Sequence, residues 1–582
     1  QNHKSLILKV KNLISNKINI KWELYAYLTI FAERFKKEKE TRTYYKPENV
    51  CIDTLEHKFG IKINEDEKKL ISKYYSSNHN EDVLRSFPKF DDDEIIKTIN
   101  FFKDIPVGFT FIDCIVLLTK SKHPNSEEIS FIENKNELLL IFNKHKIDDR
   151  KLPCPVCGSL KISGNSYPEV GIKSWECKNP LCSARSKTNR GKRYSERTTL
   201  MQNATFDFSE QNQISKELVK IWRKDVVENW SNKDLFRMIV KYFSFVNDKI
   251  TLINVKDLGL ITDEINSGGR MSEPLSFDSF LQDSELDKGI FKKFFNSDFV
   301  NLFIYSKDIS DGYQKDLNKI FDTADIKIIQ GNSFEVLHKI GSNKIHNMVT
   351  SPPYYNAREY SQWRNLYNYL NDMYNINIKS NTSLIPGGVF FYNIGDIFDN
   401  ENIIVKSKMG EKRIPLGAYT ILLFKKAGFE LLDNIIWYKG EPQSNRHKND
   451  GNYTPYYQRP ANCYEHMFIF KKEGELKLNN NIEENELKSN LIKFTPVFKI
   501  GNGGINRYGH TAPFPKNIPI LSITCFTNKG SFILDPFSGS GTSPITAAIL
   551  NRNGVGVELN EDYARLSLEK AKEHSINAVL LS

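Results

Sequence analysis

The sequence predicts an α/β protein with a parallel sheet in its C-terminal half, a mainly helical N-terminal region and a small four-cysteine ribbon. Three observations support this prediction. Two strand-and-turn units stand in the last part of the chain, and four cysteines form two close pairs. Before the two units, apolar residues recur at helical spacing, as in Trp22–Lys39 and Asp91–Lys103. With 582 residues, the chain can hold roughly two to four domains, each with its own core.

The first unit is a short strand, Asn347–Thr350, followed by the turn Ser351-Pro352-Pro353-Tyr354. Two successive prolines end the strand, because each fixes φ and removes an amide donor. The turn is therefore rigid, leaves backbone carbonyl groups free to accept hydrogen bonds and carries an aromatic ring at its tip. Such a turn suits a flat group that bears an amine. The alternative is an ordinary Pro-Pro turn with a packed tyrosine.

The second unit combines a strand, a glycine-rich turn, a helix and a further strand that ends in an acid. These parts are, in order, Ser531–Leu534, Asp535–Thr542, Pro544–Leu550 and Val555–Glu558. The arrangement brings backbone close to a nucleotide-like ligand at the carboxyl edge of a parallel sheet. Glu558 follows the glycines by about 20 residues, where an acid can bind ribose hydroxyls.

With both units in this order, the chain from about Asp325 to its end resembles the amino-group DNA methyltransferases that use S-adenosylmethionine. The Ser-Pro-Pro-Tyr turn precedes the glycine-rich turn, so the resemblance is to the circularly permuted beta class. The resemblance implies a Rossmann-like methyltransferase sheet. Gly387–Ile394 and Asn434–Lys439 resemble the family's later strands, and His510–Pro515 resembles the segment that closes over the methionine part of the cofactor.

The resemblance assigns roles to individual residues. The catalytic residues are Ser351, Pro352, Pro353 and Tyr354. The residues assigned to S-adenosylmethionine are Asp535, Pro536, Phe537, Gly539, Gly541, Thr542, Glu558, His510, Phe514 and Asn332. In the segment Ile328–Leu337 this chain has Gly331-Asn332 where the family usually has Gly-Asp, so Asn332 departs from the family pattern.

An exocyclic base amine is a poor nucleophile, because its lone pair is delocalised into the ring. If Ser351 Oγ and the Pro352 carbonyl accept its hydrogens, the nitrogen can pyramidalise toward a methyl donor, while Tyr354 stacks on the flipped base. Serine at the first motif position resembles the cytosine N4 enzymes, whereas adenine N6 enzymes more often carry Asp or Asn there. Cytosine N4 is therefore predicted, with adenine N6 as the alternative. Two further alternatives are an enzyme that methylates an amine in RNA or protein, and a zinc-dependent DNA-binding protein with an inactive methyltransferase domain.

Four cysteines predict a zinc site in the middle of the chain. Cys154 and Cys157 form C-x2-C, Cys177 and Cys182 form C-x4-C, and 19 residues separate the two pairs. Two thiolate pairs at this spacing can close a tetrahedral zinc site in a module too small for its own core. Disulfides are the weaker alternative in a reducing compartment.

Basic residues predict a nucleic-acid surface near this ribbon. The net charge of the chain is +10, and residues 151–200 hold ten Lys/Arg against three Glu, a local charge of +7. The loop Glu441–Gly451 and the residues up to Arg459 are polar, basic and aromatic, whereas the segment from Lys471 to Tyr508 is short for a recognition region. The predicted DNA contacts are Arg185, Lys187, Arg190, Lys192, Arg193, Arg446 and Arg459.

The predicted domain order follows from these parts. It is a helical N-terminal domain (1–150), the four-cysteine zinc ribbon (151–200), a helical connecting region (201–320) and the permuted methyltransferase domain (321–582). No apolar run approaches the roughly 18 residues of a membrane span, and the first residues show no secretory pattern, so a cytoplasmic protein is expected. The expected partners are double-stranded DNA and a companion restriction endonuclease, because no nuclease motif stands in this chain.

Overall fold

The structure is a computed structural model of the 582-residue chain. It describes residues 22–23, 25–26, 29, 64–66, 68–69, 109–118, 136–144, 154, 156–157, 159, 161–166, 173–183, 193–195, 214–228, 231–244, 248–253, 258–275, 304, 306–307, 317–322, 324–355, 363, 366–398, 413–439, 460–477 and 515–581. Among these residues, no helix is both long enough and apolar enough to cross a lipid bilayer.

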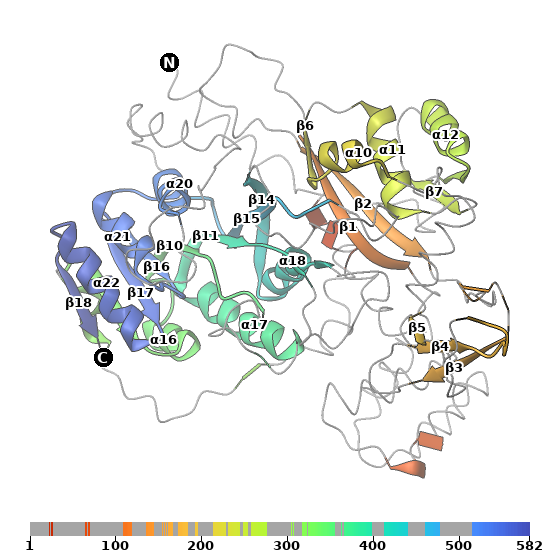
Figure 1. Ribbon diagram of the computed structural model, residues 1–582. Coiled ribbons are helices and arrows are strands. Elements are labelled where there is room, and N and C mark those ends of the chain that lie inside the picture. Colours follow the sequence, from red (N-terminus) through yellow and green to blue (C-terminus); the bar gives the residue numbers. More distant parts are fainter. Residues whose placement is uncertain are drawn as a thin grey trace, which may run out of the picture.

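An eight-stranded sheet forms the centre of the C-terminal half, with the strand order β14-β15-β11-β10-β16-β17-β9-β18 (Figure 1). The strand bounds are β9 Ile326–Gln330, β10 Ile345–Thr350, β11 Leu384–Ile394, β14 Phe429–Tyr438, β15 Tyr464–Lys472, β16 Phe532–Asp535, β17 Asn553–Glu558 and β18 Ala578–Leu581. From β11 to β18 all neighbours are parallel, whereas β15 runs antiparallel to both β11 and β14. The predicted α/β fold of this region is confirmed.

Helices cover both faces of this sheet (Figure 1). One layer consists of α16 (Ser333–Ile340), α17 (Leu366–Ser383) and α18 (Leu416–Lys426), and the other of α20 (Asn517–Phe526), α21 (Thr542–Ile549) and α22 (Glu561–Glu573). Side chains alternate between the layers: Met348 of β10 packs in the cluster that includes α16, α17 and α18, and Val349 packs in the cluster that includes α20. Because both faces are buried, the central strands are rich in apolar residues.

The strand order reverses between β10 and β16. From β10 the chain continues to β11 on one side, whereas from β16 it continues to β17 on the other side. At such a reversal the loops leave the sheet in opposite directions and open a crevice at the carboxyl ends of the strands. The Ser351–Tyr354 turn and the Asp535–Thr542 turn both begin at this edge.

A second sheet, in the order β2-β1-β6, lies beside the eight-stranded sheet (Figure 1). Its strands are β1 (Phe109–Leu118), β2 (Asn136–Lys144) and β6 (Val226–Glu228). The helices α10 (Lys216–Ile221) and α11 (Asn232–Phe243) pack on it, and α12 (Leu258–Ser267) follows with the parallel pair β7 (Lys249–Ile253) and β8 (Met271–Leu275). The described part of the region that was expected to be helical therefore also contains five strands.

The strands that the helical prediction missed have a physical explanation. Residues 113–117 of β1 are all buried, so they form a continuous buried run rather than an alternating one. Such a run does not distinguish a buried strand from a buried helix. The predicted helix from Trp22 to Lys39 agrees with the structure where it is described, because residues 22–23, 25–26 and 29 are helical. The predicted helix at Asp91–Lys103 lies outside the described residues.

The cysteine-rich segment forms a small antiparallel sheet of β3 (Ile162–Ser166), β4 (Lys173–Cys177) and β5 (Arg193–Ser195). Figure 1 shows these strands away from the eight-stranded sheet. Two strands of two residues each, β12 (Ile397–Phe398) and β13 (Arg413–Ile414), pair antiparallel.

Candidate active site and metal centre

The two sequence motifs meet through one buried carboxylate. Thr350 Oγ1, at the end of β10, donates a hydrogen bond to Asp535 Oδ1 at 2.5 Å. The other Asp535 oxygen accepts from Ser543 Oγ at 2.5 Å, and the Phe537 amide donates to Oδ1 at 3.0 Å. Burial raises the pKa of Asp535 to about 6, although the hydrogen bonds from Ser543 and Thr350 act in the opposite direction. Asp535 therefore holds the predicted catalytic turn, Ser351–Tyr354, against the glycine-rich turn, Asp535–Thr542.

The glycine-rich turn depends on two left-handed residues. Gly539 has φ +51° and Gly541 has φ +79°, a region that favours glycine. A Cβ on Gly541 would lie 2.8 Å from the Cβ of Ser567 in α22, so a side chain there would collide. Ser567 Oγ also donates to the Gly539 carbonyl at 3.0 Å. The turn is thus held close to α22 at the carboxyl edge of the sheet.

Glu558 ends β17 beside this turn. Its Oε2 accepts from the Gly539 amide at 2.8 Å and its Oε1 accepts from the Asn560 amide at 2.8 Å. Burial raises the pKa of Glu558 above its ordinary value. Each carboxylate oxygen can accept more than one hydrogen bond, so this half-buried group could still bind a hydroxyl pair.

The remaining predicted cofactor residues lie at the same edge where they are described. The Pro536 carbonyl accepts from Ser333 Oγ at 2.5 Å, which ties the turn to α16. Asn332 caps α16, because its Oδ1 accepts from the Phe334 amide at 2.9 Å. Phe537 is partly buried within the turn, and Thr542 is partly buried at the start of α21. His510 and Phe514 lie outside the described residues.

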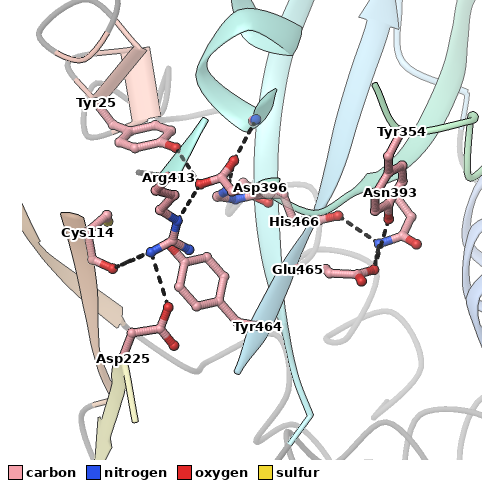
Figure 2. A network of polar contacts seen from close by, with 12 residues as sticks. Tyr25, Cys114, Asp225, Tyr354, Asn393, Asp396, Arg413, Tyr464, Glu465 and His466 are labelled. Carbon is pink, nitrogen blue, oxygen red and sulfur yellow. Dashed lines mark hydrogen bonds and ion pairs between the residues drawn. The ribbon is translucent and has the colours of Figure 1, made fainter. Parts of the chain in front are cut away.

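The catalytic turn is anchored by a residue that the sequence did not indicate. Tyr354 Oη donates to Glu465 Oε2 at 3.0 Å, and Asn393 Nδ2 donates to the same oxygen at 3.2 Å (Figure 2). Lys439 forms an ion pair with the other oxygen, Oε1. Burial, followed by the nearby Glu465 carboxylate, raises the pKa of the Tyr354 phenol well above its usual range. Within the same turn, Pro352 is buried and Ser351 is half-buried.

A second polar cluster surrounds Arg413 and was also not predicted. Arg413 Nε donates to Asp396 at 2.8 Å and its Nη1 donates to Asp225 at 3.1 Å (Figure 2). The same Nη1 also donates to Asp113 at 2.8 Å. All four side chains are buried. Asp113 belongs to β1 and Asp225 precedes β6, so the cluster joins the small sheet to the C-terminal half. The guanidinium also lies 4.7 Å from the ring centroid of Tyr464.

The four cysteines come together in the ribbon. Their sulfur atoms all lie within 4.8 Å of one another, with Cys154 and Cys182 at 3.8 Å and Cys157 and Cys177 at 3.7 Å. Four thiolates around Zn²⁺ at about 2.3 Å are about 3.8 Å apart, whereas a disulfide needs about 2.05 Å. The arrangement therefore fits a tetrahedral metal ion and does not fit two disulfides.

Backbone donors support the same set of sulfurs. The Val156 amide points to Cys154 Sγ at 3.5 Å, and the Asn179 amide points to Cys177 Sγ at 3.4 Å. Such donors stabilise the negative charge of metal-bound thiolates. The predicted metal ligands are therefore brought into one site.

The predicted DNA contacts are mostly beyond the structural description. Arg185, Lys187, Arg190, Lys192, Arg446 and Arg459 lie outside the described residues. Arg193 is the first residue of β5, and its backbone pairs opposite Glu176 of β4.

The geometry agrees with comparisons to known proteins. A family profile described as DNA methylase matches residues 345–569, from β10 to α22. The chain is 46% identical over 600 residues to the Type II beta methyltransferase M.BslI of Bacillus sp. (strain NEB-606); this match covers 100% of the chain and 66% of that relative.

Two further relatives match the catalytic half. The Type II methyltransferase M.ScaI of Streptomyces caespitosus is 25% identical over 261 residues, covering 43% of this chain and 82% of that protein. The Type II methyltransferase M.SmaI of Serratia marcescens is 28% identical over 277 residues, covering 42% of this chain and 90% of that protein. The profile match, the similarity along the whole of this chain to 66% of M.BslI and the order of the two motifs agree, and the chain belongs to the beta-class amino-group DNA methyltransferase family.

Proposed function

We propose that this chain transfers a methyl group from S-adenosylmethionine to the exocyclic N4 amine of cytosine at a specific site in double-stranded DNA. The observation that carries the proposal is the Thr350–Asp535 hydrogen bond of 2.5 Å, which joins the strand before the catalytic turn to the strand before the glycine-rich turn. Amine and methyl donor would then meet at one edge of the sheet, where positioning contributes most of the rate.

The glycine-rich side suits S-adenosylmethionine. Gly539 and Gly541 have left-handed φ values that keep the turn compact, and Glu558 offers a carboxylate for ribose hydroxyls. Helix α21 begins directly after the turn, so its first amides face the same edge. The cofactor, when bound, supplies an electrophilic methyl group on its sulfonium.

The catalytic turn suits a planar base amine. Ser351 Oγ and the Pro352 carbonyl would accept the two amine hydrogens, and the ring of Tyr354 would stack on the flipped base. The reaction needs no covalent cysteine nucleophile. The Pro-Cys dipeptide that cytosine carbon-5 methylation requires occurs in this sequence only at Pro153-Cys154, within the ribbon.

Serine at the first motif position supports cytosine N4 over adenine N6. Asp would be a stronger acceptor, whereas serine both donates and accepts, which suits a cytosine with its neighbouring ring acceptor. Adenine N6 methylation is the second candidate, because the same turn could accept the hydrogens of either amine.

The ribbon supports DNA recognition. Zinc bound by Cys154, Cys157, Cys177 and Cys182 would have four sulfur ligands and no open position, so its role would be structural. The local charge of +7 over residues 151–200 would supply phosphate contacts. Similarity to proteins named Type II methyltransferases supports a modification enzyme. We propose that it acts in the cytoplasm together with a companion restriction endonuclease.

The test uses methyl-labelled S-adenosylmethionine with duplex DNA and, separately, with RNA of the same sequence. We expect label in the duplex DNA, and we expect Tyr354→Ala to reduce the rate by orders of magnitude while its affinity for the cofactor stays near the parental value. Loss of base stacking removes roughly 1–3 kcal/mol, and misplacement of the base adds to the effect. Equal labelling of RNA, or a parental rate for Tyr354→Ala, would contradict the proposal.

A further inference from the structure

Glu465 occupies a particular place in the sheet. It is the second residue of β15, the strand that lies between β11 and β14 and runs antiparallel to both. Its neighbours Tyr464 and His466 are buried with the Arg413 cluster. Because side chains alternate along a strand, Glu465 points to the opposite face, toward Tyr354 (Figure 2).

The Glu465 carboxylate joins three strand ends. Its Oε2 accepts from Tyr354 Oη at 3.0 Å, after β10, and from Asn393 Nδ2 at 3.2 Å, near the end of β11. Its Oε1 pairs with Lys439, which follows β14. Asn393 Nδ2 also donates to the His466 carbonyl at 3.0 Å, so the amide is fixed from two sides.

Space for this side chain exists because residue 395 is glycine. A Cβ on Gly395 would lie 2.8 Å from Glu465 Cγ. The side chain of Glu465 is 14% exposed and that of Lys439 is 18% exposed. Lys439 Nζ also lies 4.6 Å from the ring centroid of Trp437. The carboxylate is therefore held by packing and by its partners rather than by solvent.

These contacts define what Glu465 can do. A charge-assisted hydrogen bond from Tyr354 Oη to an ionised acceptor is stronger than one between neutral groups. It restricts the rotation of the tyrosine ring about its two side-chain torsions. The Glu465 carboxylate forms an ion pair with Lys439, and its oxygens accept hydrogen bonds from other side chains of the chain. These contacts fit a residue that holds Tyr354 in place better than one that accepts a proton from the substrate.

We propose that Glu465 is a positioning residue, which holds the Tyr354 ring in the orientation needed to stack on the target base, with Asn393 and Lys439 fixing its carboxylate. The inference rests on the proposed function, because it assumes that Tyr354 stacks on that base. The fold would then orient the ring before DNA binds.

The experiment is a double-mutant cycle on methylation of duplex DNA. Glu465→Ala and Tyr354→Phe each remove the same hydrogen bond, so each should lower kcat, by about tenfold to a hundredfold for a misplaced ring. The double variant should be little slower than the slower single variant. Glu465→Gln keeps an acceptor oxygen for Tyr354 Oη and should retain more activity than Glu465→Ala.

The controls separate positioning from general stability. Glu430→Ala removes an acid that pairs with Lys471 at 2.9 Å at the distant end of β14, and it should leave kcat unchanged. Cofactor affinity, measured by calorimetry, should be the same in Glu465→Ala and the parent. The proposal would be overturned if the fold-loss of kcat in the double variant equals the product of the two single losses. A parental kcat for Glu465→Ala would overturn it as well.

The parent chain and Ser351→Ala are measured in the same assay. A parent chain that does not methylate DNA contradicts the proposed function itself. An active parent, an inactive Ser351→Ala and a fully active Glu465→Ala contradict only the positioning role.

Discussion

Thr350 Oγ1 donates to Asp535 Oδ1 at 2.5 Å across 185 residues of sequence. This contact fixes the end of β10 against the end of β16, and with it the catalytic turn against the glycine-rich turn. Asp535 is 3% exposed and accepts from Thr350, Ser543 and the Phe537 amide. Asp535 therefore contributes to the stability of the fold, whether or not it also contacts a cofactor.

Asp535→Ala should destabilise the chain as well as weaken cofactor binding. It leaves three donors without their acceptor, and each unsatisfied buried group costs about 1–3 kcal/mol. We expect a lower midpoint in urea unfolding. Asp535→Asn keeps one acceptor oxygen and should lose less. Equal unfolding midpoints for the parent and Asp535→Ala would show that these hydrogen bonds contribute nothing to stability.

Gly539→Val should abolish S-adenosylmethionine binding in a folded chain. Valine is β-branched and disfavours φ +51°, and its side chain would stand where the backbone must approach the ligand. Gly530→Ala is the matched control, because Gly530 has φ +81° and a Cβ added there would meet no atom within 4 Å. It should cost about 1–2 kcal/mol of stability but leave calorimetric affinity for the cofactor intact. If Gly539→Val binds S-adenosylmethionine as tightly as the parent chain does, the glycine-rich turn is not part of the cofactor site.

Cys177→Ser should release zinc and weaken DNA recognition while methyl-donor binding persists. The four sulfurs form a closed site, so loss of one ligand should affect the ribbon and leave the chemical step unchanged. Metal content, DNA affinity at several salt concentrations and site-resolved methylation provide the readout. Cys525→Ser is the control, because Cys525 lies outside the metal cluster. If the zinc-free variant matches the parent in DNA binding and methylation pattern, the ribbon has only a structural role.

The Arg413 cluster should make the free energy of unfolding depend on pH. Burial raises the pKa of Asp225 to about 8 even though Arg413 lowers it, whereas an unfolded aspartate titrates near about 3.9. The folded chain therefore binds this proton more tightly. The stabilising contribution of Asp225 is fully present below about pH 4 and is lost as the pH rises through about 8.

Asp225→Asn should remove this contribution. Between about pH 5 and about pH 8.5, the free energy of unfolding of Asp225→Asn should fall less than that of the parent. Asp113 and Asp396 remain in both proteins, so the difference between the two pH profiles isolates Asp225. If the free energies of unfolding of the two proteins change in parallel with pH, Asp225 has the same pKa in the folded and unfolded chain.

Local signals in the sequence predicted the central strands and turns. Pro352 and Pro353 end β10, and glycines at 539 and 541 mark the turn before α21, because both residue types act on the backbone locally. The spacing of the cysteine pairs indicates a metal site without any knowledge of the fold. The assigned roles of the catalytic and cofactor residues stay predictions, although most of these residues gather at one sheet edge.

Long-range pairing explains what sequence reasoning missed. Glu465 lies 111 residues from Tyr354 and 72 from Asn393, and it reaches both only because β15 inserts beside β11. Arg413 lies 300 residues from Asp113. An isolated Glu or Arg carries no local pattern that reveals such partners. Alternation of side chains along β15 was the one available signal, and it required the strand pairing to be known.

The most direct measurement of the central proposal is the identity of the methylated nucleoside. Duplex DNA is incubated with the purified chain and S-adenosylmethionine, digested to nucleosides and analysed by mass spectrometry, with Ser351→Ala as the inactive reference. We predict N4-methylcytosine in DNA treated with the parent chain and none above background with Ser351→Ala. N6-methyladenine would support the second candidate, whereas 5-methylcytosine or the absence of any methylated base would contradict amine methylation by the Ser351–Tyr354 turn.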